Sequence, residues 1–211
     1  MANTTRRLIP VSLQNGFVNL LTPLIKILTR WGINPNSFTL AGLIITSMAA
    51  VAFIMGYLRL GGFLILLGGL CDTIDGSLAR FANKATHFGA MFDSAVDRYS
   101  EFVMFFGMVV YFVMLKDYPT SVVAFFALCG SIMVSYSRAR AESLGFDSRV
   151  GIMQRPERIV FLGLGALINP GVLKFAIWLV AIFANFTAFQ RIRHAYKQSE
   201  TKLDRKPITE P

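Results

Sequence analysis

The sequence predicts an all-α integral membrane protein, with six transmembrane helices preceded by an amphipathic helix at the membrane interface. Three observations lead to this fold class. The 211 residues are 54% hydrophobic and include 19 phenylalanines, and the mean hydropathy is +0.54. Long apolar runs alternate with short polar breaks, and a membrane crossing needs about 20 such residues. The lysines and arginines gather in one set of the polar segments. Only two cysteines occur, both in apolar surroundings, so a disulfide framework is not expected.

The first expected helix, 11–30, belongs to an N-terminal segment that covers 1–37. Its apolar residues recur at helical spacing, but polar residues and Pro23 interrupt them. This pattern favours a helix that lies in the membrane interface rather than one that crosses it. The alternative, in which 11–28 spans the membrane, would reverse the topology. The break that follows is rich in turn-forming residues, and either Asn36 or Ser37 is expected to cap the next helix.

Six apolar segments then form a predicted transmembrane catalytic domain, 38–194. The expected spans are Phe38–Tyr57, Gly61–Arg80, Phe88–Leu115, Ser121–Ala141, Pro156–Asn169 and Val172–Phe189. The fifth is short for a crossing. A polar C-terminal tail, 195–211, is expected to follow.

The distribution of charge predicts the orientation of these spans. Of 21 Lys and Arg residues, only Arg59, Lys116 and Lys174 fall in or near the three short loops on one side. By the positive-inside rule the opposite side, with both termini, faces the cytoplasm. The net charge of +9 suits anionic lipid headgroups or phosphate-bearing substrates. Nucleic acid is not an expected partner, because the basic residues are scattered between apolar spans.

Four aspartates interrupt the second and third spans: Asp72, Asp75, Asp93 and Asp97, here called the aspartate cluster. An ionisable group at membrane depth costs at least a few kcal/mol, about 2.5–3.5 by insertion measurements, and usually has a function. Spacings of three and four residues place each pair on one face of its helix. Two such helices could surround one or two hard cations, which prefer oxygen ligands. Two alternatives are aspartates at helix ends near the headgroups and the cation path of a transporter.

The spacing of these residues resembles the signature of the CDP-alcohol phosphotransferase family. The matching string is Asp72-x2-Asp75-Gly76-x2-Ala79-Arg80-x8-Gly89-x3-Asp93-x3-Asp97. The resemblance implies an enzyme that works as a homodimer in the cell membrane, with its active site facing the cytoplasm. It also implies two Mg²⁺ ions, or Mn²⁺, on the aspartate cluster, with Asp97 as the catalytic base. The implied CDP-lipid-binding residues are Gly76, Ala79, Arg80, Thr86, Pro35, Asn36 and Ser37.

Two segments resemble the inositol-type members of this family. One is Gly89–Arg98, and the other combines Ser135–Glu142 with Gln154–Arg158. The resemblance implies transfer of a phosphatidyl group from CDP-diacylglycerol to inositol phosphate, with release of CMP and formation of phosphatidylinositol phosphate. The expected acceptor phosphate-binding residues are Arg138, Arg155 and Arg158, because guanidinium groups bind phosphate in a bidentate manner. Glycerol 3-phosphate, free inositol and serine remain alternative acceptors, and the arginines could instead contact lipid headgroups.

Overall fold

The expected helices are all present in the computed structural model, which describes residues 8–148 and 150–203. Within these residues the chain forms helices and no strand, so the all-α prediction is confirmed. The helices are α1 (Val11–Arg30), α2 (Pro35–Ile54), α3 (Leu58–Phe81), α4 (His87–Met114), α5 (Tyr118–Ser143), α6 (Arg155–Ile168) and α7 (Pro170–Leu203).

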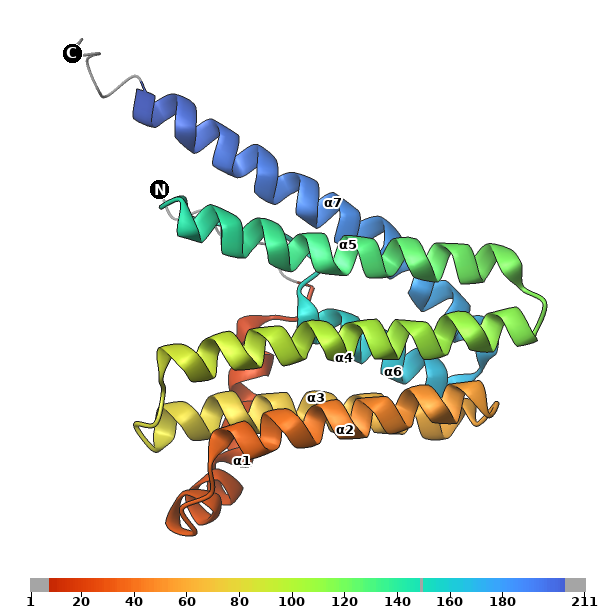
Figure 1. The fold of residues 1–211 in the computed structure, drawn as a ribbon, viewed down its shortest axis with the longest axis horizontal. Helices are drawn as coiled ribbons and strands as arrows, with labels where there is room; N and C mark the ends of the chain where they lie inside the picture. Colours follow the sequence, from red (N-terminus) through yellow and green to blue (C-terminus); the bar gives the residue numbers. More distant parts are fainter. Residues whose placement is uncertain (1–7, 149, 204–211) are drawn as a thin grey trace.

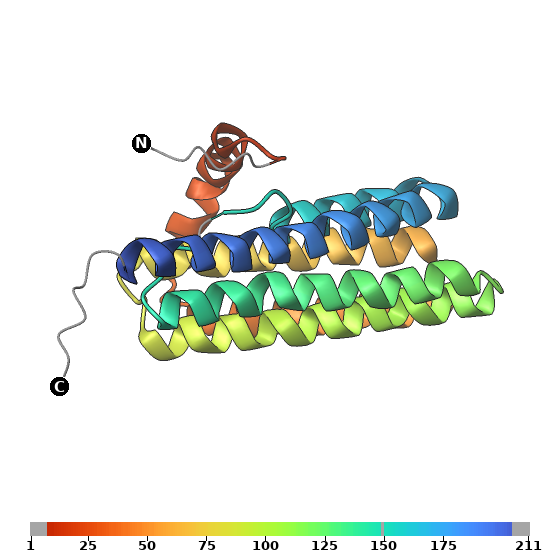
Figure 2. The same cartoon turned by 90° about the horizontal axis from the view of Figure 1, so that it is seen from above.

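Helices α2 to α7 alternate in direction along the chain (Figures 1 and 2). Helices α2, α3 and α4 are nearly parallel, whereas α7 is tilted against them (Figure 1). Their contacts follow a closed order, in which α2 packs on α3, α3 on α6, α6 on α7, α7 on α5, α5 on α4, and α4 on α2. The six helices therefore form a ring in which α3 and α4 are both neighbours of α2. The breaks after α3 and α5 lie at one end, and those after α2, α4 and α6 lie at the other.

The first membrane-length helix begins earlier than expected. Asn34 precedes α2 and its side chain accepts a hydrogen bond from the backbone N–H of Asn36 at 3.0 Å. Pro35 then occupies the first helical position, where its missing N–H has no cost. The prediction that Asn36 or Ser37 caps this helix is therefore wrong, because both lie inside its first turn.

Four helices in the described part of the chain are long and apolar enough to cross a membrane: α2, α3, α5 and α7. Helix α6 has only 14 residues. Helix α4 is long enough, with 28 residues, but it carries Asp97, Arg98 and Glu101 along its middle. These charged side chains explain why composition alone does not identify α4 as a span.

The interior of the ring is packed with aromatic and aliphatic side chains from all six helices. Its largest fully buried apolar members are Phe53, Phe105, Phe112, Ile65, Met108, Met153, Leu162, Leu173 and Ile177. At the contact of α4 with α2, a Cβ added to Gly107 would lie 2.6 Å from the Cα of Ala50. The two helix backbones can approach this closely only because residue 107 has no side chain.

Gly107→Ala is therefore expected to destabilise the protein by about 1–3 kcal/mol, since backbone atoms cannot move aside cheaply. The matched control is Gly16→Ala in α1, where an added Cβ meets nothing within 4 Å. There the change should be neutral or stabilise by up to about 1 kcal/mol, because alanine is the better helix former. Unfolding of the two purified variants in detergent measures the difference, and equal effects would contradict the packing described here.

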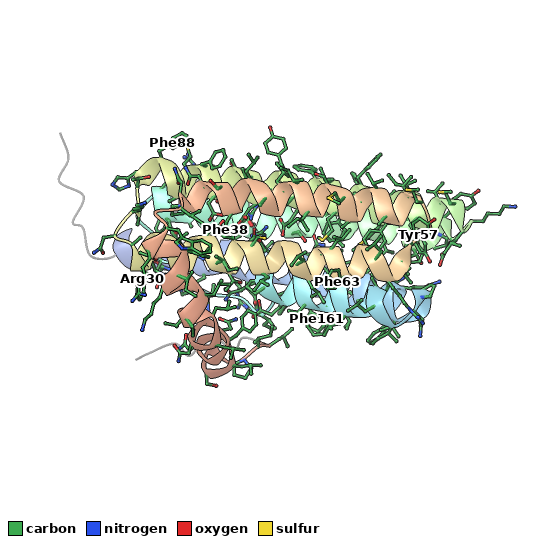
Figure 3. The ribbon with its side chains drawn as sticks, turned by 90° about the horizontal axis from the view of Figure 1, so that it is seen from below. Arg30, Phe38, Tyr57, Phe63, Phe88 and Phe161 are labelled. Carbon is green, nitrogen blue, oxygen red and sulfur yellow. The ribbon has the colours of Figure 1, made fainter. Side chains whose placement is uncertain are left out.

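Helix α1 lies across one end of the ring rather than along it (Figures 2 and 3). Ile25 and Leu28 are buried against Ile74 and Leu78 of α3. Leu21 is half-buried beside them, and Leu13, Phe17, Leu20, Leu24 and Ile27 are exposed. An exposed apolar stripe suits a helix in the membrane interface, and this location stays a prediction.

The last helix extends further than hydropathy indicates. Helix α7 continues to Leu203, so the predicted polar tail, 195–211, begins inside a helix. The remainder of that tail, 204–211, lies outside the described residues.

At the opposite end of the ring, Asp117 connects three helices. Its carboxylate caps α5 through the backbone N–H of Thr120 at 3.2 Å and accepts a bond from Lys174 Nζ of α7 at 2.8 Å. The hydrogen bond from Lys174 and those from Thr120 hold the pKa of Asp117 below its ordinary value. This end contains few other charges, which agrees with the charge asymmetry of the sequence.

Candidate functional site

The aspartate cluster comes together between α3 and α4. Asp72 and Asp75 lie in the second half of α3, and Asp93 and Asp97 lie in the first half of α4. Asp93 is close enough to interact electrostatically with each of the other three carboxylates. The structure thus brings the two pairs close together, and their joint role as a cation site stays a prediction.

One arginine lies between the two halves of the cluster. Arg155, the first residue of α6, places its Nη1 atom 2.6 Å from Asp72 Oδ2 and 2.5 Å from Asp97 Oδ1. Because both oxygens contact the same nitrogen, they lie at most about 5 Å apart. A single positively charged atom is thus bound by carboxylates from two different helices.

This arrangement allows a test of whether the cluster suits a divalent metal ion. Carboxylate oxygens are the ligands that Mg²⁺ and Mn²⁺ prefer, and Nη1 of Arg155 acts as a stand-in cation between two of them. In this conformation no three acidic, histidine or cysteine side chains of the described residues converge tightly enough to enclose a metal. The donor chemistry of the cluster therefore fits a divalent cation, and in this structure Arg155 occupies two of its oxygens.

Helix α2 supports the cluster through residues that sequence reasoning did not identify. Thr39 Oγ1 donates a 2.7 Å hydrogen bond to Asp75 Oδ2, and both side chains are buried. A Cβ at Gly42 would lie 3.1 Å from Asp72 Oδ1, so a larger residue there would crowd that carboxylate. With Thr46, these residues form a stripe of small and hydroxyl side chains at helical spacing. That stripe is a recognisable signal for a packed membrane-helix face.

A buried ion pair lies one turn below the cluster. Glu101 follows Asp97 by four residues on the same face of α4, and its carboxylate accepts hydrogen bonds from Nε (3.1 Å) and Nη2 of Arg158. The two side chains are only 2% and 1% exposed. Arg98 adds a second contact, with Nε 3.6 Å from Glu101 Oε2. The prediction that Arg158 binds the acceptor phosphate is therefore corrected, because its guanidinium is enclosed with Glu101.

A small cavity of about 10 Å³, enough for roughly one water molecule, lies between α2, α3, α4 and α6. Its lining combines the site residues with their neighbours: Thr46, Ile65, Gly69, Asp72, Ser100, Glu101, Met104, Arg155 and Ile159. The charged groups of the site and of the buried ion pair thus border the same small space.

The loop before Arg155 is tied to α7. Backbone N–H groups of Ile152 and Met153 donate to Thr187 Oγ1 at 3.2 and 3.1 Å. Arg191 Nε donates to the carbonyl of Val150 at 2.9 Å. These bonds hold the segment that leads into α6 and therefore position the backbone of Arg155, its first residue. Thr187 and Arg191 were not identified in the sequence, because their partners are more than 30 residues away.

The predicted CDP-binding residues lie at the end of the ring where α2 and α4 begin. A Cβ at Gly89 would stand 3.0 Å from Thr86 Oγ1 and 3.6 Å from Asn36 Oδ1, so these three residues adjoin. The exposed guanidinium of Arg80 lies over Gly76, with Nη1 3.5 Å from an added Cβ. Thr86 also caps α4 by accepting the Gly89 N–H at 2.9 Å.

The other three predicted CDP-binding residues occupy the same helices. Pro35 is buried at the start of α2, Ser37 is exposed beside it, and Ala79 is partly buried next to Arg80. Their contact with CDP stays a prediction. Arg138, predicted to hold the acceptor, pairs with Glu142 at 2.9 Å on the exposed surface of α5.

Comparison with known proteins agrees with this site. Residues 32–189 match the family model described as CDP-alcohol phosphatidyltransferase. The chain is 38% identical to the archaetidylinositol phosphate synthase of Pyrococcus horikoshii over 176 residues, which cover 83% of this chain and 90% of that protein.

Two solved structures of the phosphatidylinositol phosphate synthase of Mycobacterium tuberculosis share the fold. The complex with CDP-DAG superposes with a TM-score of 0.76 at 30% identity, over 84% of this chain and 94% of that one. The complex with manganese and citrate gives a TM-score of 0.76 at 30% identity, over 83% and 88%. The resemblance carried by the aspartate string is confirmed, and the chain belongs to the CDP-alcohol phosphatidyltransferase family.

Proposed function

We propose that this protein transfers a phosphatidyl group from CDP-diacylglycerol to a hydroxyl of inositol phosphate, releasing CMP. Membership of the family supports the reaction class. The names of the relatives support the acceptor, since both act in the synthesis of inositol phosphate lipids. The observation that carries the proposal is the convergence of Asp72 and Asp97, from facing helices, on one cationic atom.

The aspartate cluster would hold two Mg²⁺ ions, with Mn²⁺ able to replace them. When bound, such ions neutralise the diphosphate and align the attacking and leaving oxygens. Asp97 accepts the proton of the acceptor hydroxyl while that oxygen bonds to the lipid-bearing phosphorus. The bond from this phosphorus to the oxygen of CMP then breaks. A carboxylate can serve as the base, because the proton moves only as the oxygen–phosphorus bond forms.

The CDP group would lie at the end of the ring where α2 and α4 begin. Arg80 supplies an exposed guanidinium for phosphate oxygens, and Gly76 and Ala79 leave room beside the helix backbone. Asn36, Ser37 and Thr86 offer polar groups nearby, and Pro35 fixes the start of α2. For the acceptor, Arg155 and Arg138 would bind the phosphate of inositol phosphate, with Arg158 acting only through its pair with Glu101.

A comparison of acceptors tests this function. CMP release by the purified chain with CDP-diacylglycerol should depend on inositol phosphate. It should be slow with free inositol, glycerol 3-phosphate or serine, because these either lack the phosphate or the ring. Equal rates with inositol and inositol phosphate would remove the reason for an arginine site and contradict the proposed acceptor.

The site would face the cytoplasm, in a homodimer whose six ring helices, α2 to α7, all contribute to the membrane domain. The few charges at the opposite end of the ring support this orientation. In a chain with both native cysteines replaced by alanine, Ala85→Cys between α3 and α4 should react with an impermeant thiol reagent only from the cytoplasmic side. Tyr118→Cys at the start of α5 should react only from the other side. Both residues are exposed, and the reverse labelling pattern would contradict the orientation.

A further inference from the structure

The position of Arg155 has a consequence for how ligands bind. Its Nη1 atom contacts one oxygen of Asp72 and one of Asp97, at 2.6 and 2.5 Å. These two aspartates come from different helices and belong to the cluster assigned above to the metal ions. The guanidinium therefore satisfies the same oxygens that a divalent cation would need.

We propose that Arg155 is a built-in competitor of the metal. Binding of the divalent cation displaces its guanidinium from Asp72 and Asp97 and frees it for the phosphate of the acceptor. This inference rests on the proposed function, because it takes the metal ligands and the acceptor from it. The new element is an exchange of cations, in which the Arg155 guanidinium leaves the two carboxylates as the metal ion binds them.

Charge and chemistry both require the exchange. An arginine side chain cannot lose its proton in a protein, so it cannot become neutral to share the site with a cation. A cation bonded to both oxygens would lie close to Nη1, and like charges in a partly buried site repel strongly. The backbone of Arg155 is fixed by the loop that Thr187 holds. The movement is therefore a swing of the long side chain and not a shift of α6.

Arg98 provides the matched contrast. It also touches Asp97, with Nη2 3.5 Å from Oδ2, and extends toward Glu101. It forms no ion pair with another member of the cluster and acts on Asp93 only through its charge. Removing Arg98 takes away a nearby positive charge without removing a group that bridges Asp72 and Asp97. If only the nearby positive charge mattered, replacing either arginine should raise the metal affinity by a similar factor. Competition for the same oxygens instead predicts a large rise in metal affinity only when Arg155 is replaced.

The exchange also couples the two ligands. If the metal frees Arg155 for a phosphate, a phosphate that holds Arg155 must favour the metal by the same factor. Inositol phosphate should therefore tighten metal binding in the wild-type protein. In a protein without the Arg155 guanidinium, this tightening should disappear, because the carboxylates are already free.

The experiment measures Mn²⁺ affinity by electron paramagnetic resonance in the detergent-purified full chain, without CDP-lipid. Arg155→Gln should bind Mn²⁺ about 5- to 150-fold more tightly than wild type, the usual range of coupling between sites. Arg98→Gln should change the affinity much less. Adding inositol phosphate should tighten binding in wild type and in Arg98→Gln, but not in Arg155→Gln.

A second measurement needs no variant and so does not depend on folding of a mutant. Phenylglyoxal modification of Arg155, followed by mass spectrometry, should increase when Mn²⁺ is added to the wild-type protein. Unchanged or reduced modification, or equal Mn²⁺ affinity in wild type and Arg155→Gln, overturns the competition. A gain in Mn²⁺ affinity in Arg98→Gln as large as the gain in Arg155→Gln, measured without inositol phosphate, also overturns it. Failure of the wild type to bind Mn²⁺ at all would instead remove the proposed metal site, and with it the proposed mechanism.

Discussion

Asp97→Asn is expected to lower kcat for CMP release by about 10²–10⁴-fold, the usual contribution of a general base. An amide cannot accept the proton of the acceptor hydroxyl, although it keeps the size and an oxygen of the carboxylate. CDP-diacylglycerol should still bind, since its diphosphate would be held by Arg80 and by the metal ions that the other aspartates retain. Initial rates and lipid binding, measured on the same preparation, separate the two properties.

The remaining members of the cluster should behave differently. Asp72→Asn, Asp75→Asn and Asp93→Asn should each abolish CMP release, because each removes a charged ligand from the shared cation site. Asp117→Asn is the matched control, since this aspartate lies at the opposite end of the ring with Lys174, and its activity should remain close to wild type. Full activity in any of the first three variants would disprove the two-cation site.

Glu101→Gln is expected to cost about 3–5 kcal/mol of stability, the usual effect of removing one member of a buried ion pair. The change leaves Arg158, which is 1% exposed, without its charged partner. It also removes the carboxylate that Arg98 contacts. Unfolding in detergent, followed by heat or denaturant, measures the loss.

The chain offers a matched control for this prediction. Glu142→Gln breaks the pair with Arg138, whose side chains are 43% and 46% exposed. Exposed pairs contribute about 0–1 kcal/mol, because water already solvates both partners. The double variant Glu101→Gln with Arg158→Gln should recover part of the loss, since no buried charge then lacks a partner. Similar losses for Glu101→Gln and Glu142→Gln would argue against a buried pair.

The sequence predicted the helices and the aspartate cluster well, because both depend on short-range patterns. Apolar runs reveal helices of membrane length, and spacings of three and four residues place Asp72 with Asp75 and Asp93 with Asp97. The predicted helix boundaries were less accurate where a polar side chain caps the helix, as Asn34 does at the start of α2. Helix α7 extends past its apolar part to Leu203, and hydropathy does not register a polar continuation of a helix.

The contacts around the cluster could not be predicted from these patterns. Glu101 and Arg158 are 57 residues apart, and their pairing depends on which helices become neighbours in the ring. Thr39 reaches Asp75 across 36 residues in the same way. For the arginines, the sequence predicted one shared phosphate site formed by Arg138, Arg155 and Arg158. The structure divides their positions, with Arg155 on the aspartates, Arg158 in a buried pair and Arg138 on the surface.

The most direct test of the proposed reaction is the identity of the lipid product. Purified protein, CDP-diacylglycerol, Mg²⁺ and inositol phosphate should yield CMP together with a lipid whose mass equals phosphatidylinositol phosphate, and Asp97→Asn should yield neither. Because the acceptor phosphate is proposed to bind Arg155 and not to react, it should remain on the product. CMP accompanied by phosphatidic acid, or by an inositol lipid without that phosphate, would contradict the transfer proposed here.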